Sequence, residues 1–264
     1  MKIKPEDIEE VYCDGDVWSY RIGYSCQHEP PAPPPPWFTI KWAIDETIDK
    51  VQRTFPNANI IITMTDEVHN YRIGVSDLVK YKGGRISTKP YFWRKIRDYF
   101  YSLPNVVVSE NEEADDLMSK ALMKGSHVAC VSVDKDLKNT PGVHFNDMSE
   151  QLIHVNPAQA YRNFYMQLLT GDQIDNIKGC PRIGKTKAAE LLRDCRTPEE
   201  FECVIGLAYA SAKGYKLKDG TFVPMDDPEA RMIEMGQLLW MRRVDDEMWN
   251  LRANGFTTKD TPCG

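Results

Sequence analysis

The stretch HVACVSVDKD, residues 127–136, is an apolar run rich in valine that stops at two aspartates. The same pattern occurs in VYCDGD, residues 11–16, and in NIIITMTD, residues 59–66. Apolar, β-branched runs of this length predict buried strands. We therefore expect three strands that end at Asp14, Asp66 and Asp134.

Helix-like segments separate these runs and a fourth strand at 106–108. They cover residues 38–54, 91–103 and 113–124. Alternation of strands with helices of this length predicts an α/β fold with a mainly parallel central sheet covered by helices on both faces. In such sheets ligands bind beyond the carboxyl ends of the strands, which is where the aspartates would lie.

The second part of the chain has helical patterns. Helix-start signals occur at Asn156-Pro157 and at Thr197-Pro198, a polar segment at 214–224 predicts a loop or hairpin, and a last helix is predicted from 228 to 243. We expect two parts, an α/β core over residues 1–155 and a helical region over 156–264 packed on it. The proline tract at 30–36 predicts a stiff surface loop.

Composition is that of a soluble protein. The chain has 264 residues, 42% of them hydrophobic and 27% charged, and a formal net charge of −6. The first ten residues contain no apolar signal region, and no run is long enough to cross a membrane. The seven cysteines form no C-x-x-C pair, so reduced thiols in a cytoplasm, or in a host cytoplasm for a viral protein, are expected. The net charge does not by itself exclude nucleic acid as a partner.

Acidic residues gather at the predicted strand ends and helix starts. Asp14 with Asp16, Glu113-Ala114-Asp115-Asp116, Asp134 with Asp136, and Asp172 with Asp175 form four clusters, and Asp66 stands alone. Hard oxygen ligands in this number suit Mg²⁺ or Mn²⁺. Two metal ions about 3.5 to 4 Å apart can support in-line displacement at phosphorus, which predicts phosphodiester hydrolysis. Simple helix capping is the alternative interpretation of Asp115 and Asp116.

Three basic segments accompany the acids. The loop 81–85, YKGGR, joins an aromatic ring, two cations and two glycines, and it suits a phosphate as well as a solvated turn. The turn 179–184 precedes Lys185 and Lys187, and its amides suit a duplex phosphate or a plain helix–helix turn. Segment 91–97 interleaves aromatic and basic residues, and its helical spacing favours a core-packing helix with a wet basic face.

Together these motifs resemble the bacteriophage and bacterial 5′-nuclease family of 5′ to 3′ exonucleases and flap endonucleases, which have a PIN-like fold. The resemblance covers nearly the whole chain. It rests on Asp14-Gly15-Asp16, Thr65-Asp66 with Arg72 and the 81–85 loop, the 113–116 and 132–136 motifs, and 171–177. The turn 179–184 looks like the helix-hairpin-helix variant of that family, which binds duplex DNA and often a K⁺ ion.

The resemblance implies an enzyme that hydrolyses DNA near 5′ ends and leaves 5′-phosphates, acting in replication or recombination. RNA primers in RNA–DNA hybrids are implied as further substrates, and a monomer as the active state. Two or three Mg²⁺ ions, with Mn²⁺ as a substitute, would be bound by Asp14, Asp66, Glu113, Asp115, Asp116, Asp134, Asp136, Asp172 and Asp175. The catalytic basic residues would be Lys82, Arg85 and Arg72, and DNA would contact Tyr81, Lys82, Arg85, Gly179, Gly184, Lys185 and Lys187.

Two departures from the family pattern bear on these implications. Arg182 stands where the turn commonly has glycine and Lys187 where many members have threonine, which puts K⁺ binding in question. Only residues 86–90 separate the 81–85 loop from the next predicted helix, so the long helical arch of flap-threading relatives is absent from the pattern. The short form resembles phage exonucleases that degrade duplex DNA from 5′ ends.

Two other classes of protein fit parts of the sequence. Haloacid-dehalogenase-like phosphohydrolases also have Asp-x-Asp after a first strand and a later Gly-Asp motif, which Asp14-Gly15-Asp16 and Gly171-Asp172 partly fit. This interpretation leaves the 113–116 motif and the 179–184 turn without a function. A non-catalytic nucleic-acid-binding module with the nuclease fold would lack some of the acids, and none is missing.

Overall fold

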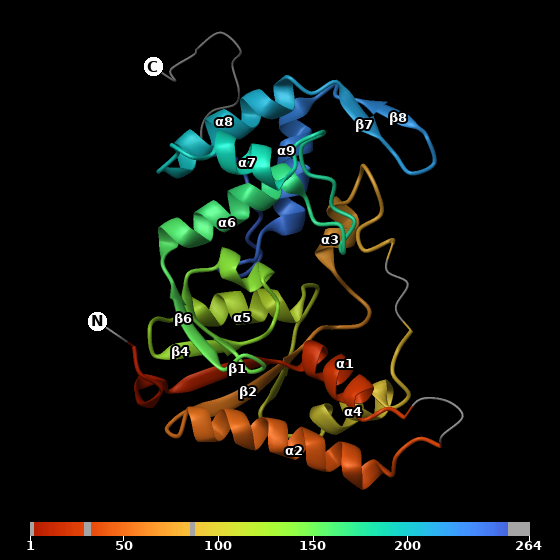
Figure 1. The fold of residues 1–264 in the computed structure, drawn as a ribbon, viewed down its shortest axis with the longest axis vertical. Coiled ribbons are helices and arrows are strands. Elements are labelled where there is room, and N and C mark those ends of the chain that lie inside the picture. The colour runs from red at the N-terminus through yellow and green to blue at the C-terminus, as the bar shows by residue number, and fades with distance from the viewer. Residues whose placement is uncertain (1–2, 29–32, 85–87, 253–264) are drawn as a thin grey trace. The chain divides into compact units, whose positions relative to one another are not determined.

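The computed structural model describes residues 3–28, 33–84 and 88–252, which fall into two compact units (Figure 1). Unit 1 holds the described residues of 1–70, 86–156 and 241–246, and unit 2 those of 71–85, 157–240 and 247–264. The units differ from the contiguous division at residue 155 in two places. Segment 71–85 belongs to unit 2 and segment 241–246 to unit 1 because each makes its tertiary contacts there.

Unit 1 is built on a six-stranded sheet with the order β3-β2-β1-β4-β5-β6. The first five strands run parallel and β6 pairs antiparallel with β5, which confirms the predicted mainly parallel sheet. The β5–β6 pair was not predicted. The strands are β1 Glu10–Asp14, β2 Asn59–Met64, β3 Val106–Val108, β4 Val128–Val131, β5 Gly142–Asn146 and β6 Gln151–Val155.

Helices cover both faces of this sheet. Along β1, Val11 and Cys13 join the apolar cluster of α1 and α2, whereas Tyr12 packs with α5 on the other face. Figure 1 shows α2 and α5 on opposite sides of the strands. The helices of unit 1 are α1 Gly15–Ser25, α2 Trp37–Thr54, α4 Trp93–Tyr101 and α5 Ala114–Leu122, with short 3-10 turns η1 Pro5–Asp7 and η2 Asp136–Asn139. The three predicted helices are confirmed within a few residues at their ends, and α1 was missed.

Strand register determines where the acids lie. In the parallel pairing, Asp14 of β1 lies opposite Thr63 of β2, and Cys13 lies opposite Val131 of β4. The carboxyl ends of these three neighbouring strands therefore meet at one edge of the sheet. This edge carries the residues that follow each strand, as expected for a ligand site in a parallel sheet.

Unit 2 is mainly helical and has its own aromatic core, which includes Phe164, Tyr165, Trp240 and Trp249. The predicted hairpin is present as β7 and β8. The elements are α3 Tyr71–Val75, α6 Pro157–Thr170, α7 Lys185–Leu191, α8 Pro198–Ala210, β7 Gly214–Lys216, β8 Phe222–Pro224 and α9 Pro228–Leu239.

The last helix is shorter than predicted. It ends at Leu239 rather than residue 243, and Trp240 has extended backbone angles. The buried guanidinium of Arg72 donates hydrogen bonds to the carbonyl oxygens of Leu238 at 3.1 Å and Trp240 at 2.7 Å. These bonds satisfy carbonyls at the helix end, so a residue distant in sequence stabilises the end of α9.

None of the helices within the described ranges is both long and apolar enough to span a membrane. The six cysteines that lie in these ranges are all free thiols.

Gly171 lies in a tight loop of unit 2. Its φ is +69°, and a Cβ atom there would come within 2.3 Å of the carbonyl oxygen of Ile177 and 2.7 Å of the amide nitrogen of Gly179. We expect Gly171→Ala to lower the free energy of unfolding of unit 2 by about 3 kcal/mol or more, because strain and a backbone clash add. Urea unfolding followed by tryptophan fluorescence measures this.

Gly74 supplies the matched control, because it lies in α3 with open space around it and ordinary φ. Gly74→Ala is expected to leave stability unchanged or slightly raised. Equal stability of Gly171→Ala and wild type would contradict the loop geometry.

Candidate active site

Asp14 and Asp134 are joined through one serine at the ends of β1 and β4. The hydroxyl of Ser132 donates to Asp14 Oδ2 at 2.8 Å and accepts from the Asp134 amide at 3.0 Å. The other oxygen of Asp14 accepts from the Val17 amide at 2.9 Å and caps α1. Ser132 is the first residue of the 132–136 motif, but the sequence did not reveal that it bridges the two acids.

The buried carboxyl of Asp14 is in an unfavourable electrostatic setting. Burial raises the pKa of Asp14 to about 7, and the charges of Asp16 and Asp134 act in the same direction. Hydrogen bonds from Val17 and Ser132 oppose the shift. A bound cation would relieve both the desolvation and the repulsion, so the donor chemistry at this edge fits a divalent metal ion.

The loop after β2 is tied to the segment that leads into α5. The Asp66 amide donates to the Ser109 hydroxyl at 3.0 Å, and that hydroxyl donates to the carbonyl of Glu112 at 2.6 Å. Hydrogen bonds to its own carboxylate, chiefly from the Val68 amide, lower the pKa of Asp66. Asp66 is thus held as an anion beside the start of α5.

The start of α5 carries three of the predicted ligands. Glu113 accepts from the side-chain amide of Asn70 at 2.8 Å, and Asp115 lies in the first helical turn. The fully buried Asp116 accepts from the amides of Glu113 at 3.1 Å and Arg242 at 2.9 Å. The capping interpretation is therefore confirmed for Asp116, while its metal-binding role stays a prediction.

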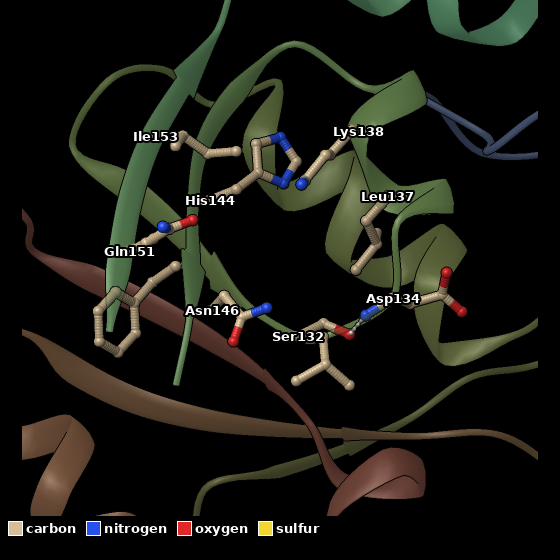
Figure 2. A pocket seen from close by; sticks show the side chains of 10 residues that line it. Ser132, Asp134, Leu137, Lys138, His144, Asn146, Gln151 and Ile153 are labelled. Carbon is tan, nitrogen blue, oxygen red and sulfur yellow. Dashed lines mark hydrogen bonds between the residues drawn. The ribbon is translucent and has the colours of Figure 1, made fainter. Parts of the chain in front are cut away.

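Asp134 and Asp136 lead into η2 beside a small pocket. The Asp136 amide donates to Asp134 Oδ1 at 2.8 Å, so the two acids form one turn. The pocket has a volume of about 40 Å³ and is lined by side chains that include Lys138, His144 and Asn146. Figure 2 shows Ser132 and Asp134 at one end of this lining and His144 at the other. A cavity of this size holds water rather than a nucleotide base.

His144 makes the stability of unit 1 sensitive to acid. Burial lowers its pKa from the ordinary 6.5 to about 4, and one ring nitrogen lies 2.9 Å from the Thr140 carbonyl oxygen. Between pH 6.5 and pH 4 the unfolded state therefore binds more protons than the folded state. We expect His144 to make its full contribution to the free energy of unfolding above pH 6.5. This contribution should fall by about 3 kcal/mol as the pH drops to 4.

Urea unfolding at pH 7 and pH 5 measures this effect. The change in the free energy of unfolding between the two pH values is compared among variants, because other groups titrate in the same range. His144→Gln is expected to show a weaker acid dependence than wild type. His28→Gln, at an exposed position of unit 1, is the control and is expected to match wild type. Identical acid dependence in all three proteins would contradict the assignment.

In unit 2 the predicted phosphate loop contacts one of the predicted acids. The hydroxyl of Tyr81 donates to Asp175 Oδ2 at 3.1 Å, and the ammonium of Lys82 lies 3.8 Å from the same oxygen. The Lys82 amide also donates to the Asp175 carbonyl at 2.8 Å, and Lys82 has a φ of +53°. The loop is thus held in a sparsely populated conformation by the 172–177 segment, a pairing that the sequence did not reveal.

Asp172 organises that segment itself. Its Oδ1 accepts from the amides of Ile174 at 2.7 Å and Asp175 at 3.2 Å, and its backbone pairs with Ile177. Further along the chain, the Gly179 carbonyl accepts from the hydroxyl of Tyr215 at 2.8 Å. The acids and the following turn are therefore parts of one ordered loop.

The turn before α7 keeps its basic residues exposed. Gly184 is the N-cap of α7, and both Lys185 and Lys187 are exposed in its first turn. Arg182 adopts a φ of +63°, a conformation that favours glycine, at the position where the family pattern commonly has glycine. The side chains of Lys185 and Lys187 are therefore accessible to a ligand, and the DNA-binding role of the turn stays a prediction.

Two further predicted basic residues have different outcomes. Arg72 is buried, with 1% of its surface exposed, and its guanidinium contacts the end of α9. These contacts give Arg72 a structural role, and the catalytic role of Arg72 stays a prediction. Arg85 lies outside the described residues.

In the described ranges 3–28, 33–84 and 88–252, no three His, Cys, Asp or Glu side chains form a cluster that could hold one metal ion. Mg²⁺ usually binds through one or two carboxylates and keeps several waters. At the edge of the sheet the charges of Asp14 and Asp134 interact, and one or two such carboxylates are what an ion of this kind requires.

Comparison with known structures identifies the class of fold. A structure of bacteriophage T5 5′-exonuclease with divalent zinc ions superposes with a TM-score of 0.62 at 17% identity, covering 88% of this chain and 89% of that one. A complex of bacteriophage T5 D15 flap endonuclease with DNA and metal ions gives 0.57 at 14% identity, over 88% and 86%. The chain has the fold of the 5′-nucleases.

Sequence comparison finds relatives that are named as nucleases or polymerases. A 5′-3′ exonuclease of Mycoplasmopsis pulmonis is 29% identical over 198 residues, which are 66% of this chain and 65% of that protein. DNA polymerase I of Bacillus caldotenax is 32% identical over 162 residues, 53% of this chain and 18% of the polymerase. The matches thus span less than two thirds of these relatives, and no protein-family model matches the chain.

Proposed function

We propose that the protein is a divalent-metal-dependent nuclease that hydrolyses DNA near 5′ ends, as a 5′ to 3′ exonuclease and flap endonuclease. The observation that carries this proposal is the Asp14–Ser132–Asp134 arrangement at the carboxyl edge of a 5′-nuclease sheet. Burial and repulsion at Asp14 favour a bound cation there. Named relatives with this fold bind divalent metal ions and DNA, which supports the same partners for this chain.

The metal ions would be Mg²⁺, with Mn²⁺ as a substitute, in a set of two or three. In unit 1 the ligands would be Asp14, Asp66, Glu113, Asp115, Asp116, Asp134 and Asp136, some of them through water. The same role for Asp172 and Asp175 rests on the sequence resemblance. Such ions acidify a bound water and stabilise the attacking and leaving oxygens of an in-line displacement.

The chain's own basic groups would handle the phosphates. Lys82, held near Asp175 and over the ring of Tyr81, would contact the phosphate at the cleavage position together with Arg85. The turn 179–184 with Lys185 and Lys187 would contact the duplex backbone as a helix-hairpin-helix element, and the same turn would be the place for K⁺. The substrates would include RNA–DNA hybrids, with a role in replication or recombination.

A gel assay tests the proposal. The purified protein is incubated with blunt and flapped duplexes, labelled at either the 5′ or the 3′ end, in Mg²⁺ or in EDTA. Release of short 5′-labelled products in Mg²⁺ alone is expected, and the product lengths separate end trimming from cutting at the junction. An RNA-primed duplex in parallel tests the hybrid substrate. No cleavage of any substrate would contradict the proposal and favour a phosphohydrolase or a binding module.

A further inference from the structure

We propose that Asp16 and Arg97 form a clasp around the backbone of Thr65 and act as positioning residues for the metal ligands; this rests on the proposed function. Neither residue belongs to the predicted ligand or phosphate-binding set. The clasp lies wholly within unit 1 and joins α1, the end of β2 and α4.

Arg97 is the cationic half of the clasp. It lies on α4 with 3% of its surface exposed, although the sequence pattern predicted a wet basic face for this helix. Its guanidinium donates to Asp16 Oδ1, to the Thr65 carbonyl at 2.9 Å, to Glu67 Oε1 at 3.1 Å and to the Tyr101 hydroxyl at 2.7 Å. A planar guanidinium with this many acceptors has little freedom to move.

Asp16 completes the ring from the other side. Its Oδ2 accepts from the Thr65 amide at 3.0 Å, while Oδ1 bonds to Arg97. The N–H and the C=O of one residue are therefore both held by the same ion pair. Rotation of either peptide plane at Thr65 would break a bond to a charged group, and such bonds contribute more to stability than neutral ones.

Thr65 transmits this constraint to the acids. Its hydroxyl accepts from the Ala114 amide at 2.9 Å. Asp66 follows Thr65 directly, and Glu113 and Asp115 flank Ala114. Asp14 lies two residues before Asp16 at the N-cap of α1. The hydrogen bonds of Thr65 therefore connect three segments, at the ends of β1 and β2 and at the start of α5. Each of these segments carries predicted metal ligands.

Mutation of a group that orients a metal ligand without touching the metal typically lowers metal affinity or activity by about 10- to 100-fold. Asp16 as a direct metal ligand is the competing interpretation. The two differ in the response to changes at Arg97. If Asp16 and Arg97 act as a clasp, loss of the Arg97 guanidinium lowers metal affinity. If Asp16 binds the metal directly, its contribution to metal affinity does not depend on Arg97.

The test compares Asp16→Asn, Arg97→Lys and Thr65→Val with Arg94→Ala. Arg94 is the matched control because it lies on the same helix and pairs with the same Glu67 at 2.8 Å, while within the described residues its other ion pair is with Asp98. Mn²⁺ binding to the DNA-free protein is measured by calorimetry, and kcat and KM by steady-state cleavage. Folding of each variant is checked by urea unfolding.

In the three clasp variants we expect the Mn²⁺ dissociation constant to rise and kcat to fall, each by about tenfold or more, with KM for DNA little changed. The Mn²⁺ dissociation constant and kcat of Arg94→Ala are expected to stay within about twofold of wild type, because exposed ion pairs usually contribute little. In the double variant Asp16→Asn with Arg97→Lys, the losses of Mn²⁺ affinity and kcat are expected to be no larger than in the more impaired single variant. Both changes disrupt the same hydrogen-bonded clasp.

Normal Mn²⁺ affinity in folded Arg97→Lys would overturn the clasp and leave Asp16 as a ligand. If Arg97→Lys does not fold, normal affinity in Thr65→Val decides against the proposal in the same way. A wild-type protein that binds Mn²⁺ but cuts no DNA would contradict the proposed nuclease function alone, because the binding comparison still tests the clasp. Wild-type protein that binds no Mn²⁺ would overturn both.

Discussion

Asp134→Asn is expected to lower the Mg²⁺-dependent cleavage rate by about a thousandfold or more, because a metal ion that supplies several kcal/mol of transition-state stabilisation loses an anionic ligand. The substitution keeps the shape of the side chain. The Asp134 amide can still donate to Ser132, and the Asp136 amide can still donate to the side-chain oxygen at position 134. The local turn should therefore persist while the charge is lost.

Single-turnover cleavage and DNA binding in Ca²⁺ measure the two consequences separately. DNA affinity is expected to remain close to that of wild type, because Asp134 does not belong to the predicted phosphate-binding set. Asp98→Asn is the matched control, since Asp98 is an exposed partner of Arg94 on α4 in the same unit. A cleavage rate within a few-fold of wild type in Asp134→Asn would remove the main support for the proposed function.

Lys82→Ala is expected to reduce kcat by about 100- to 1000-fold, the usual cost of removing a donor aimed at developing negative charge. Its side chain is 27% exposed and its ammonium lies 3.8 Å from Asp175, so it is held in place rather than freely mobile. The backbone at position 82 has a positive φ, which alanine tolerates poorly, so stability must be measured as well.

Lys82→Arg separates charge from geometry, because it keeps the charge on a longer and differently shaped group. Lys80→Ala, an exposed lysine two residues earlier in the same loop, is the control and is expected to leave kcat unchanged. A rise in KM alone for Lys82→Ala would make Lys82 a substrate-positioning residue instead of a stabiliser of the transition state.

The predicted strands and most predicted helices were confirmed because their signals are local. An apolar run ended by a carboxylate, as at Asp14 and Asp134, shows both a buried strand and its end. The helix α1 was missed because it begins directly after Asp14, which serves as the last residue of β1 and as the helix N-cap at once. The β5–β6 pair was missed because neither Gly142–Asn146 nor Gln151–Val155 is a continuous apolar run, and each strand carries a histidine.

The sequence by itself determined the mainly parallel sheet and the placing of acids at its carboxyl edge, since strand runs, caps and spacing are properties of short segments. Only the tertiary structure decided which partner each polar group takes. Thr65 is held by Asp16 and Arg97, and Arg72 donates to backbone carbonyls at the end of α9. These contacts join positions far apart in the chain, and their geometry depends on how helices pack on the sheet, which local patterns do not encode.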